Sequence, residues 1–313
     1  MSATDQILLN ATAAGCAAVD ALAVDVTTLR AWVADELSKL LGHPHSILLT
    51  GSCTHALEAA ALLSMVGPGD EVIVPAFTFP STANAFLLRG ATVRFADVEL
   101  STGNVDPSSV AERISERTRV IVPVHYGGVS ADMDVLLPLA SRHGAMIIED
   151  AAQAIHARLD GVPLGRLGPL GALSFHRTKN VVAGDGGALV INDPDLVEAA
   201  HQMIDKGTNR TLFTAGLVDA YEWTSLGSAW HMPDPAIATI AASLHERDHV
   251  QAARHHVWQR YMQALAPWAS DHGVRLLLFM TAWITLPTCS GWDCRARRFA
   301  GASSNTAGHE ELR

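Results

Sequence analysis

Lys179 is a lysine whose sequence neighbours predict that it points inward. It lies between a short apolar segment, residues 171–175, and a glycine-rich loop, residues 184–187. A partly desolvated lysine amine gives up its proton more readily than a solvated one, and it can condense with an aldehyde to form a Schiff base. The same pattern also fits an ordinary solvated loop lysine, so the rest of the chain has to decide between these interpretations.

A second candidate is a phosphate site in the run Ser52-Cys53-Thr54-His55. This run separates a predicted strand, residues 46–49, from an alanine-rich and leucine-rich helix that ends at residues 67–69. The N-terminus of such a helix offers unpaired backbone N–H groups and a partial positive charge, and the hydroxyl groups of Ser52 and Thr54 stand beside it. The alternative is that the two hydroxyl residues only cap the helix.

A third candidate is the pair Asp150 and Gln153, at the end of a predicted strand over residues 145–150. Ligands of open α/β sheets lie beyond the carboxyl ends of the strands, so Asp150 is at an informative position. If the turn that follows is helical, Gln153 faces the same side, and a carboxylate and an amide meet one ligand. The alternative for Asp150 is a plain helix N-cap.

The elements that must position these residues alternate between strand and helix. This alternation predicts an α/β fold with a mostly parallel sheet and helices on both faces. Apolar spacing and turn residues predict strands over 46–49, 71–75, 91–95, 120–124, 145–150, 171–175 and 187–191, and helices over 28–41, 81–88, 134–142, 193–206 and 235–261.

Composition excludes several classes of function. The 313 residues are 49% hydrophobic and 17% charged, which is typical of a globular protein with a sizeable core. A formal net charge of −10 argues against binding to nucleic acid or to an anionic membrane. The longest late apolar run, residues 276–287, is too short for a membrane-spanning helix. The scattered cysteines favour free thiols in the cytoplasm.

Several motifs in fixed order carry a family resemblance. They are Ser52 to Glu58, Phe77-Thr78-Phe79 followed by Ser81 to Phe86, Val124 to Gly128, Glu149 to Ala154, Ser174 to Asn180, and Lys206 to Arg210. Over about residues 28–266 the chain resembles the DegT/StrS group of sugar-nucleotide aminotransferases, which use pyridoxal 5′-phosphate. The later motifs are most similar to the branch that makes dTDP-4-amino-4,6-dideoxygalactose. The resemblance implies a fold-type I transferase.

The resemblance also implies roles for the candidate residues. Lys179 would hold pyridoxal phosphate as a Schiff base and then carry the proton. Asp150 would pair with the pyridinium nitrogen and keep it protonated. Gln153 would contact the ring hydroxyl, and Phe79 would stack on the ring face.

Four further positions would contact the phosphate in members of this family. Thr54, the backbone at His55, and Ser174 would hold it from the same subunit. Asn209 would reach the phosphate of the neighbouring subunit, which implies a homodimer. No position implies a metal ligand.

The function implied by the resemblance is transfer of an amino group from L-glutamate to a dTDP-4-keto-6-deoxyhexose. The expected organisation is a divergent segment over residues 1–27, a large cofactor-binding domain over 28–262, and a remnant of the family's small domain over 263–313. This remnant has no consistent hydrophobic period and is expected to be partly disordered. The alternative is therefore a truncated homologue with impaired catalysis.

A motif of another class is His245-Glu246-Arg247-Asp248-His249, which matches the H-E-x-x-H pattern of zinc hydrolases. On a continuous helix His249 would lie about 40° round from His245, whereas the third candidate ligand, His255, would lie about 80° from His245 on the opposite side. The zinc interpretation therefore needs a turn after His249, and the alanines that follow favour a continuing helix. A polar helix face is the favoured interpretation.

Overall fold

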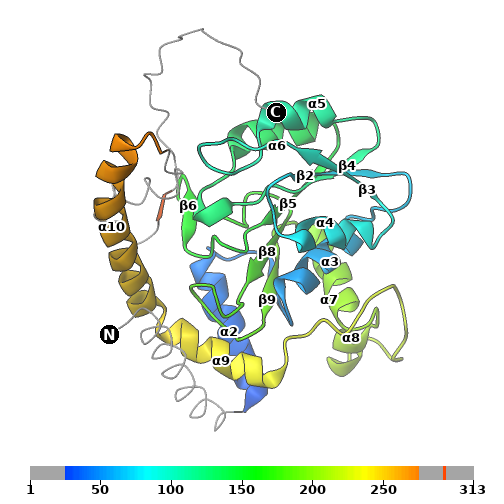
Figure 1. Ribbon diagram of the computed structural model, residues 1–313. Helices are drawn as coiled ribbons and strands as arrows, with labels where there is room; N and C mark the ends of the chain where they lie inside the picture. Colours follow the sequence, from blue (N-terminus) through cyan, green and yellow to red (C-terminus); the bar gives the residue numbers. More distant parts are fainter. Residues whose placement is uncertain (1–24, 275–291, 294–313) are drawn as a thin grey trace.

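The computed structural model describes residues 25–274 and residues 292–293. A seven-stranded sheet of order β1-β9-β8-β5-β4-β2-β3 forms its centre (Figure 1). Its strands are β1 (Ser46–Thr50), β2 (Glu71–Pro75), β3 (Thr92–Ala96), β4 (Thr118–Ile121), β5 (Met146–Asp150), β8 (Leu170–Ser174) and β9 (Gly187–Ile191). The pairs among β3, β2, β4, β5 and β8 are parallel, while β9 runs antiparallel to both β8 and β1. The predicted α/β fold with a mostly parallel sheet is confirmed.

Helices cover both faces of this sheet, because neighbouring strand residues point to opposite sides. Ile148 packs in a core with α3, α4 and α7, while its neighbour Ile147 packs in a core on the other side with α5 and α6. A third core joins α2 and α9 to β1, β8 and β9. The helix bounds are α2 (Val26–Leu40), α3 (Cys53–Leu63), α4 (Pro80–Leu87), α5 (Pro107–Arg113), α6 (Met133–Arg142), α7 (Val197–Ile204), α8 (Arg210–Thr214) and α9 (Asp234–His245).

Short elements complete the fold. A small three-stranded sheet has the order β10-β6-β7, with β6 (Ala157–Leu159), β7 (Val162–Pro163) and β10 (Trp292–Asp293). Two 3-10 turns, η1 (Tyr126–Gly128) and η2 (Pro194–Leu196), follow β4 and β9. Among the described residues, no helix is long and apolar enough to cross a bilayer.

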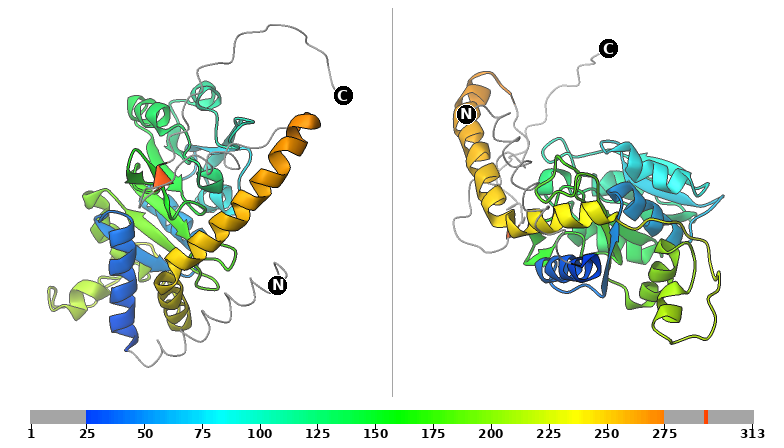
Figure 2. Two further views of the ribbon diagram at one scale, coloured as in Figure 1. Left: turned by 90° about the vertical axis from the view of Figure 1, so that its left-hand side faces the viewer. Right: turned by 90° about the horizontal axis from the view of Figure 1, so that it is seen from below.

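The prediction of one continuous helix over residues 235–261 is wrong, because the chain forms two helices there. The first, α9, ends at His245, and α10 (Arg247–Asp271) follows after a break at Glu246. Figure 2 shows α10 running along the side of the molecule after this bend. The boundary expected at residue 262 falls inside α10, while most of the expected remnant lies outside the described residues.

Candidate functional site

The candidate site is a cleft of about 220 Å³ beyond the carboxyl ends of β5 and β8. It brings three predicted residues together, because Lys179, Gln153 and Ser174 all line it. The other lining residues are Gly127, Ala152, Ile155, Thr178 and Asn180. The parallel strands place these side chains at one edge of the sheet, where ligands of open α/β sheets bind.

Asp150 lies at the end of β5, with only 4% of its surface exposed. The Thr82 hydroxyl donates a hydrogen bond to its Oδ2 at 2.7 Å, and the Ala152 backbone N–H donates to Oδ1 at 3.1 Å. Burial raises the pKa of Asp150, while these hydrogen bonds and the charge of Lys179 act in the opposite direction. Among the described residues, no cationic side chain forms an ion pair with this carboxylate, so its buried charge lacks a counter-charge in direct contact.

Thr82 belongs to a chain of hydroxyl groups at the start of α4. Its hydroxyl proton is donated to Asp150, so it accepts the hydrogen bond from the Thr78 hydroxyl, at 2.8 Å. The neighbouring Ser81 hydroxyl lies 2.7 Å from the Thr54 hydroxyl of α3. Two consecutive residues of α4 therefore link Asp150 to the start of α3. The helix begins at Pro80, where the missing backbone N–H costs no hydrogen bond.

The N-terminus of α3 faces the same region. Ser52 is the N-cap, and its side chain accepts the His55 backbone N–H at 3.1 Å. A Cβ atom at Gly187 would lie 2.4 Å from the Cys53 backbone nitrogen, so only glycine lets β9 approach the helix this closely. Burial raises the pKa of the Cys53 thiol well above its ordinary value, and the charges of Asp150 and Lys179 both act on it. The helix N-terminus is thus a neighbour of both residues.

Gln153 is held by Gly127, another residue that lines the cleft. Its Oε1 accepts the Gly127 backbone N–H at 2.8 Å, and Gly127 adopts a positive φ of 61°. The turn after Asp150 is not helical, so helical spacing is not what places Gln153 at the site. Gln153 nevertheless lines the cleft. With Oε1 occupied, the amide presents Nε2 as a donor for an anionic oxygen.

The chain contains three lysines, and they differ in their surroundings. Lys39 pairs with Asp35 and Glu36 on α2, and Lys206 pairs with Asp205. Among the lysines, all of which lie within the described residues, Lys179 is the one that lines the cleft.

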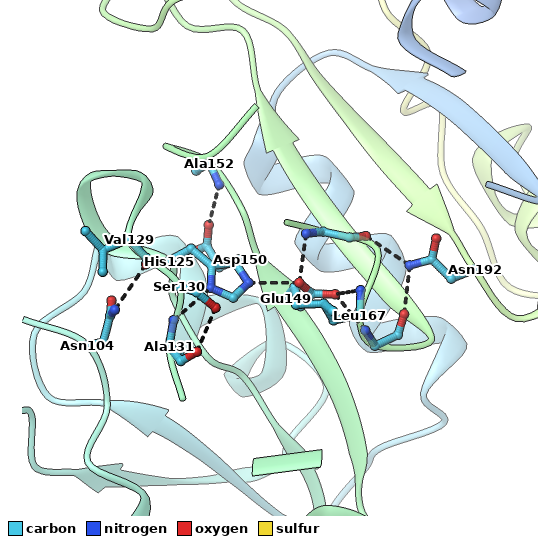
Figure 3. Close-up of polar contacts among 12 residues, drawn as sticks. Asn104, His125, Val129, Ser130, Ala131, Glu149, Asp150, Ala152, Leu167 and Asn192 are labelled. Atoms are coloured by element: carbon cyan, nitrogen blue, oxygen red, sulfur yellow. Dashed lines mark hydrogen bonds and ion pairs between the residues drawn. The ribbon is translucent and has the colours of Figure 1, made fainter. Parts of the chain in front are cut away.

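A buried network fixes the strand ends below the site (Figure 3). The Glu149 carboxylate accepts the backbone N–H groups of Gly165, Leu167 and Gly168 at 2.6 to 2.7 Å. His125 Nδ1 accepts the Ala131 N–H at 3.2 Å, so its ring proton is on Nε2, which donates to Glu149 at 2.8 Å. Glu149 is therefore a buried anion beside a neutral histidine.

Thr82, Glu149 and His125 belong to the sequence motifs, but their positions in the sequence predicted no role for them. One signal was available for Glu149, since a carboxylate in an otherwise apolar strand must find donors if it is buried. Thr82 and His125 gave no comparable signal, because their partners are 68 and 24 residues away in the chain.

Of the predicted residues that do not line the cleft, Asp150 belongs to the end of β5 and Thr54 and His55 to the start of α3, while Phe79 and Asn209 lie elsewhere. The Phe79 ring is 73% exposed, at the N-cap of α4 next to the hydroxyl chain. Asn209 is buried, with its Nδ2 donating to the Ala220 carbonyl and its Oδ1 accepting the Glu222 N–H. It borders a different cavity, of about 400 Å³, between α7 and α8. Its predicted role in a neighbouring subunit stays a prediction.

The zinc interpretation finds no support in the geometry. His245 ends α9 and His249 belongs to α10, so the H-E-x-x-H motif does not share one continuous helix. Within the described part of the chain, no group of three His, Cys, Asp or Glu side chains is arranged to hold a metal ion.

Comparison with known proteins identifies the class that this fold and site define. A model of the DegT/DnrJ/EryC1/StrS aminotransferase family matches residues 31–281, and the chain belongs to this family. It is 35% identical over 250 residues to the spore coat polysaccharide biosynthesis protein SpsC of Bacillus subtilis, a match that covers 76% of the chain and 64% of the relative. The chain thus spans less than two thirds of that relative's length.

Solved structures agree with this assignment. The chain is 32% identical to 3-amino-5-hydroxybenzoic acid synthase with a TM-score of 0.72, over 82% of this chain and 66% of that one. It is also 32% identical to DesV of S. venezuelae, determined with a ketimine intermediate, with a TM-score of 0.69 over 76% and 62% of the two chains. The fold-type I architecture is therefore confirmed, and pyridoxal 5′-phosphate is the cofactor of the family.

The residues at the cleft fit this cofactor. Asp150 is a buried carboxylate without a cationic partner among the described residues, as a pyridinium nitrogen requires. The start of α3 suits a phosphate, Gln153 offers a donor for the ring oxygen, and Lys179 offers an amine.

Proposed function

We propose that this chain is a pyridoxal-phosphate-dependent aminotransferase that moves an amino group from L-glutamate to a nucleotide-linked 4-keto sugar. A dTDP-4-keto-6-deoxyhexose is the first candidate, with dTDP-4-amino-4,6-dideoxygalactose as the product. The observation that carries the proposal is the cleft that Lys179 and Gln153 both line, with Lys179 close enough to the buried Asp150 for its charge to oppose the burial that raises the pKa of that carboxyl. The name of the relative SpsC, a polysaccharide biosynthesis protein, supports a role in making sugars for a cell-surface polysaccharide.

Each residue has a task in this reaction. Bound pyridoxal phosphate would supply a carbonyl that accepts the amino group and a cationic ring that withdraws electrons. Lys179 would hold the cofactor through its Nζ, and the same Nζ would carry the proton that leaves the carbon bearing the amino group. Asp150 holds the proton on the ring nitrogen, and Gln153 orients the ring through its amide. The α3 N-terminus with Thr54 would hold the phosphate together with Ser174, and the His55 N–H would join them by exchanging its bond to the Ser52 hydroxyl for one to the phosphate.

The proposal includes a homodimer in the cytoplasm. Asn209 would complete the phosphate site of the neighbouring subunit, and Phe79 would cover the ring face. The Phe79 ring is exposed among the described residues, and this exposure supports its role in stacking on the cofactor ring.

Amino transfer from glutamate to a dTDP-4-keto-6-deoxyhexose tests the proposal, with the aminated sugar nucleotide measured by mass spectrometry. The parent protein should form the product, and Asp150→Asn should lose several orders of magnitude in rate, because the ring nitrogen loses its anionic partner. Near-parental turnover by Asp150→Asn would contradict the assigned role. Cofactor binding without turnover of any keto sugar nucleotide would favour the impaired homologue.

A further inference from the structure

The segment from Lys179 to Val182 is attached to α9 and α10 by three hydrogen bonds. Arg254 Nη2 donates to the Lys179 carbonyl oxygen at 3.0 Å. Asn180 Nδ2 donates to Gln251 Oε1 at 2.7 Å, and the Val182 backbone N–H donates to the Ser243 hydroxyl at 2.9 Å. The helices therefore contact the lysine loop at three of four successive positions.

The contact between Gln251 and Asn180 is the strongest candidate for a functional role. Gln251 is only 8% exposed although α10 is largely exposed, so its side chain is directed at the loop. Asn180 lines the cleft directly after Lys179. The short hydrogen bond between the Gln251 and Asn180 amides therefore fixes the side chain of Asn180, which directly follows the reactive lysine.

The other restraints on the loop near Lys179 are hydrogen bonds within the loop itself, such as the one from the Arg177 N–H to the Gly184 carbonyl oxygen at 2.9 Å. Arg177, Thr178, Gly184 and Asp185 are exposed, and the Lys179 backbone N–H bonds within the loop, to the His176 carbonyl oxygen at 2.8 Å. The attachment to α10 is therefore a restraint that reaches Lys179 and Asn180 from outside the loop, in addition to the loop's own hydrogen bonds.

We propose that Gln251, acting through Asn180, is a positioning residue for Lys179. The inference rests on the proposed function, in which Lys179 forms the Schiff base. It makes α10 a part of the active site, although the helix lies outside the layers that cover the sheet. The Arg254 side chain, three residues further along the same helix face, supports the same segment.

The test compares Gln251→Leu, Gln251→Glu and the parent protein, each mixed with pyridoxal phosphate and followed by its visible absorption. Gln251→Leu keeps the side-chain bulk but removes the acceptor, so the Schiff-base band should appear about tenfold more slowly. The pH midpoint of the band should also shift, because the lysine then presents its nitrogen to the ring at a different angle. Gln251→Glu keeps an acceptor oxygen for Asn180 and should restore both values toward the parent.

Two further variants separate positioning from a general loss of stability. Asn180→Ala should give the same defect as Gln251→Leu, and the double variant should add little to either, because both act through one contact. Gln263→Leu changes an exposed glutamine on the same helix and should leave the band unaltered.

A parental rate and pH midpoint in Gln251→Leu would overturn this inference while leaving the proposed function intact. Additive defects in the double variant would also overturn it. Absence of the band in the parent protein would overturn the proposed function and this inference with it.

Discussion

At the scale of single residues, the site is defined by the groups that act on the pKa of one buried carboxylate. Asp150 is almost fully buried, and burial raises its pKa. Thr82 opposes that effect, because its hydroxyl proton stabilises the charged form. Thr78 in turn donates to Thr82 and so holds the hydroxyl in this direction. The proposed chemistry needs Asp150 in its ionised form. That form is favoured by Thr82 and Thr78, two side chains to which no contact with the cofactor or the substrate is assigned.

Replacing Thr82 by Val should weaken this arrangement without changing the volume of the side chain. The pKa of Asp150 should then rise further, so the acid limb of the pH–rate profile should move to higher pH. Turnover at neutral pH should fall about 10- to 100-fold. Thr82→Ser, which keeps the hydroxyl, is the matched control and should behave like the parent. An acid limb at the same pH in Thr82→Val and the parent would contradict this role.

Which residues form the site was partly predictable from the sequence. Lys179, Gln153 and Ser174 were expected to share a ligand, and they line one cleft. Thr82 could not be assigned, because its contact with Asp150 depends on how α4 packs against the end of β5. The H-E-x-x-H motif shows the opposite case, in which a sequence pattern has no geometry to support it.

At the scale of elements, prediction succeeded where a glycine or a proline stands at a boundary of a short apolar run. The strands at residues 71–75 and 187–191 were predicted with the bounds that they have. The break between α9 and α10 was missed, because neither glycine nor proline stands at Glu246 and the residues around it favour helix. The pairing of His125 with Glu149 was missed because it depends on the parallel register of β4 and β5.

Glu71 ties the neighbouring strands together at the opposite end of the sheet from the cleft. Its buried carboxylate accepts hydrogen bonds from Arg94, Arg117 and Ser115. These partners, Arg94 first, lower its pKa from 4.5 to about 2. The free energy of unfolding that this charge contributes is fully present above pH 4.5, and it is lost as the pH falls from 4.5 through about 2.

Glu71→Gln should therefore reduce the free energy of unfolding at pH 7 by about 1 to 2 kcal/mol, since two exposed arginines lose their partner. The difference from the parent should shrink as the pH falls through the range from 4.5 to 2. Urea unfolding at a series of pH values measures both effects. Glu112→Gln, which changes an exposed glutamate, is the control. A difference that stays constant between pH 5 and 3 would show that the charge of Glu71 is not its cause.

At the scale of the whole molecule, the sheet collects side chains from distant parts of the chain at one edge. The start of α3, the start of α4, the end of β5 and the loop after β8 meet around Asp150 and Lys179. The attachment of α10 to the lysine loop extends the site to the last described helix. The family assignment and the position of Lys179 together lead to the central claim, that Lys179 is the residue that binds the cofactor.

Reductive trapping tests this claim most directly, because the chain has only three lysines. The protein is incubated with pyridoxal phosphate, reduced with borohydride, digested and mapped by mass spectrometry. The reduced cofactor should be found on the peptide that contains Lys179, and Lys179→Ala should abolish the labelling. Lys39 and Lys206, which are paired with carboxylates, serve as internal controls and should stay unlabelled. Labelling of Lys39 or Lys206 to the same extent, or an unlabelled Lys179, would contradict the account.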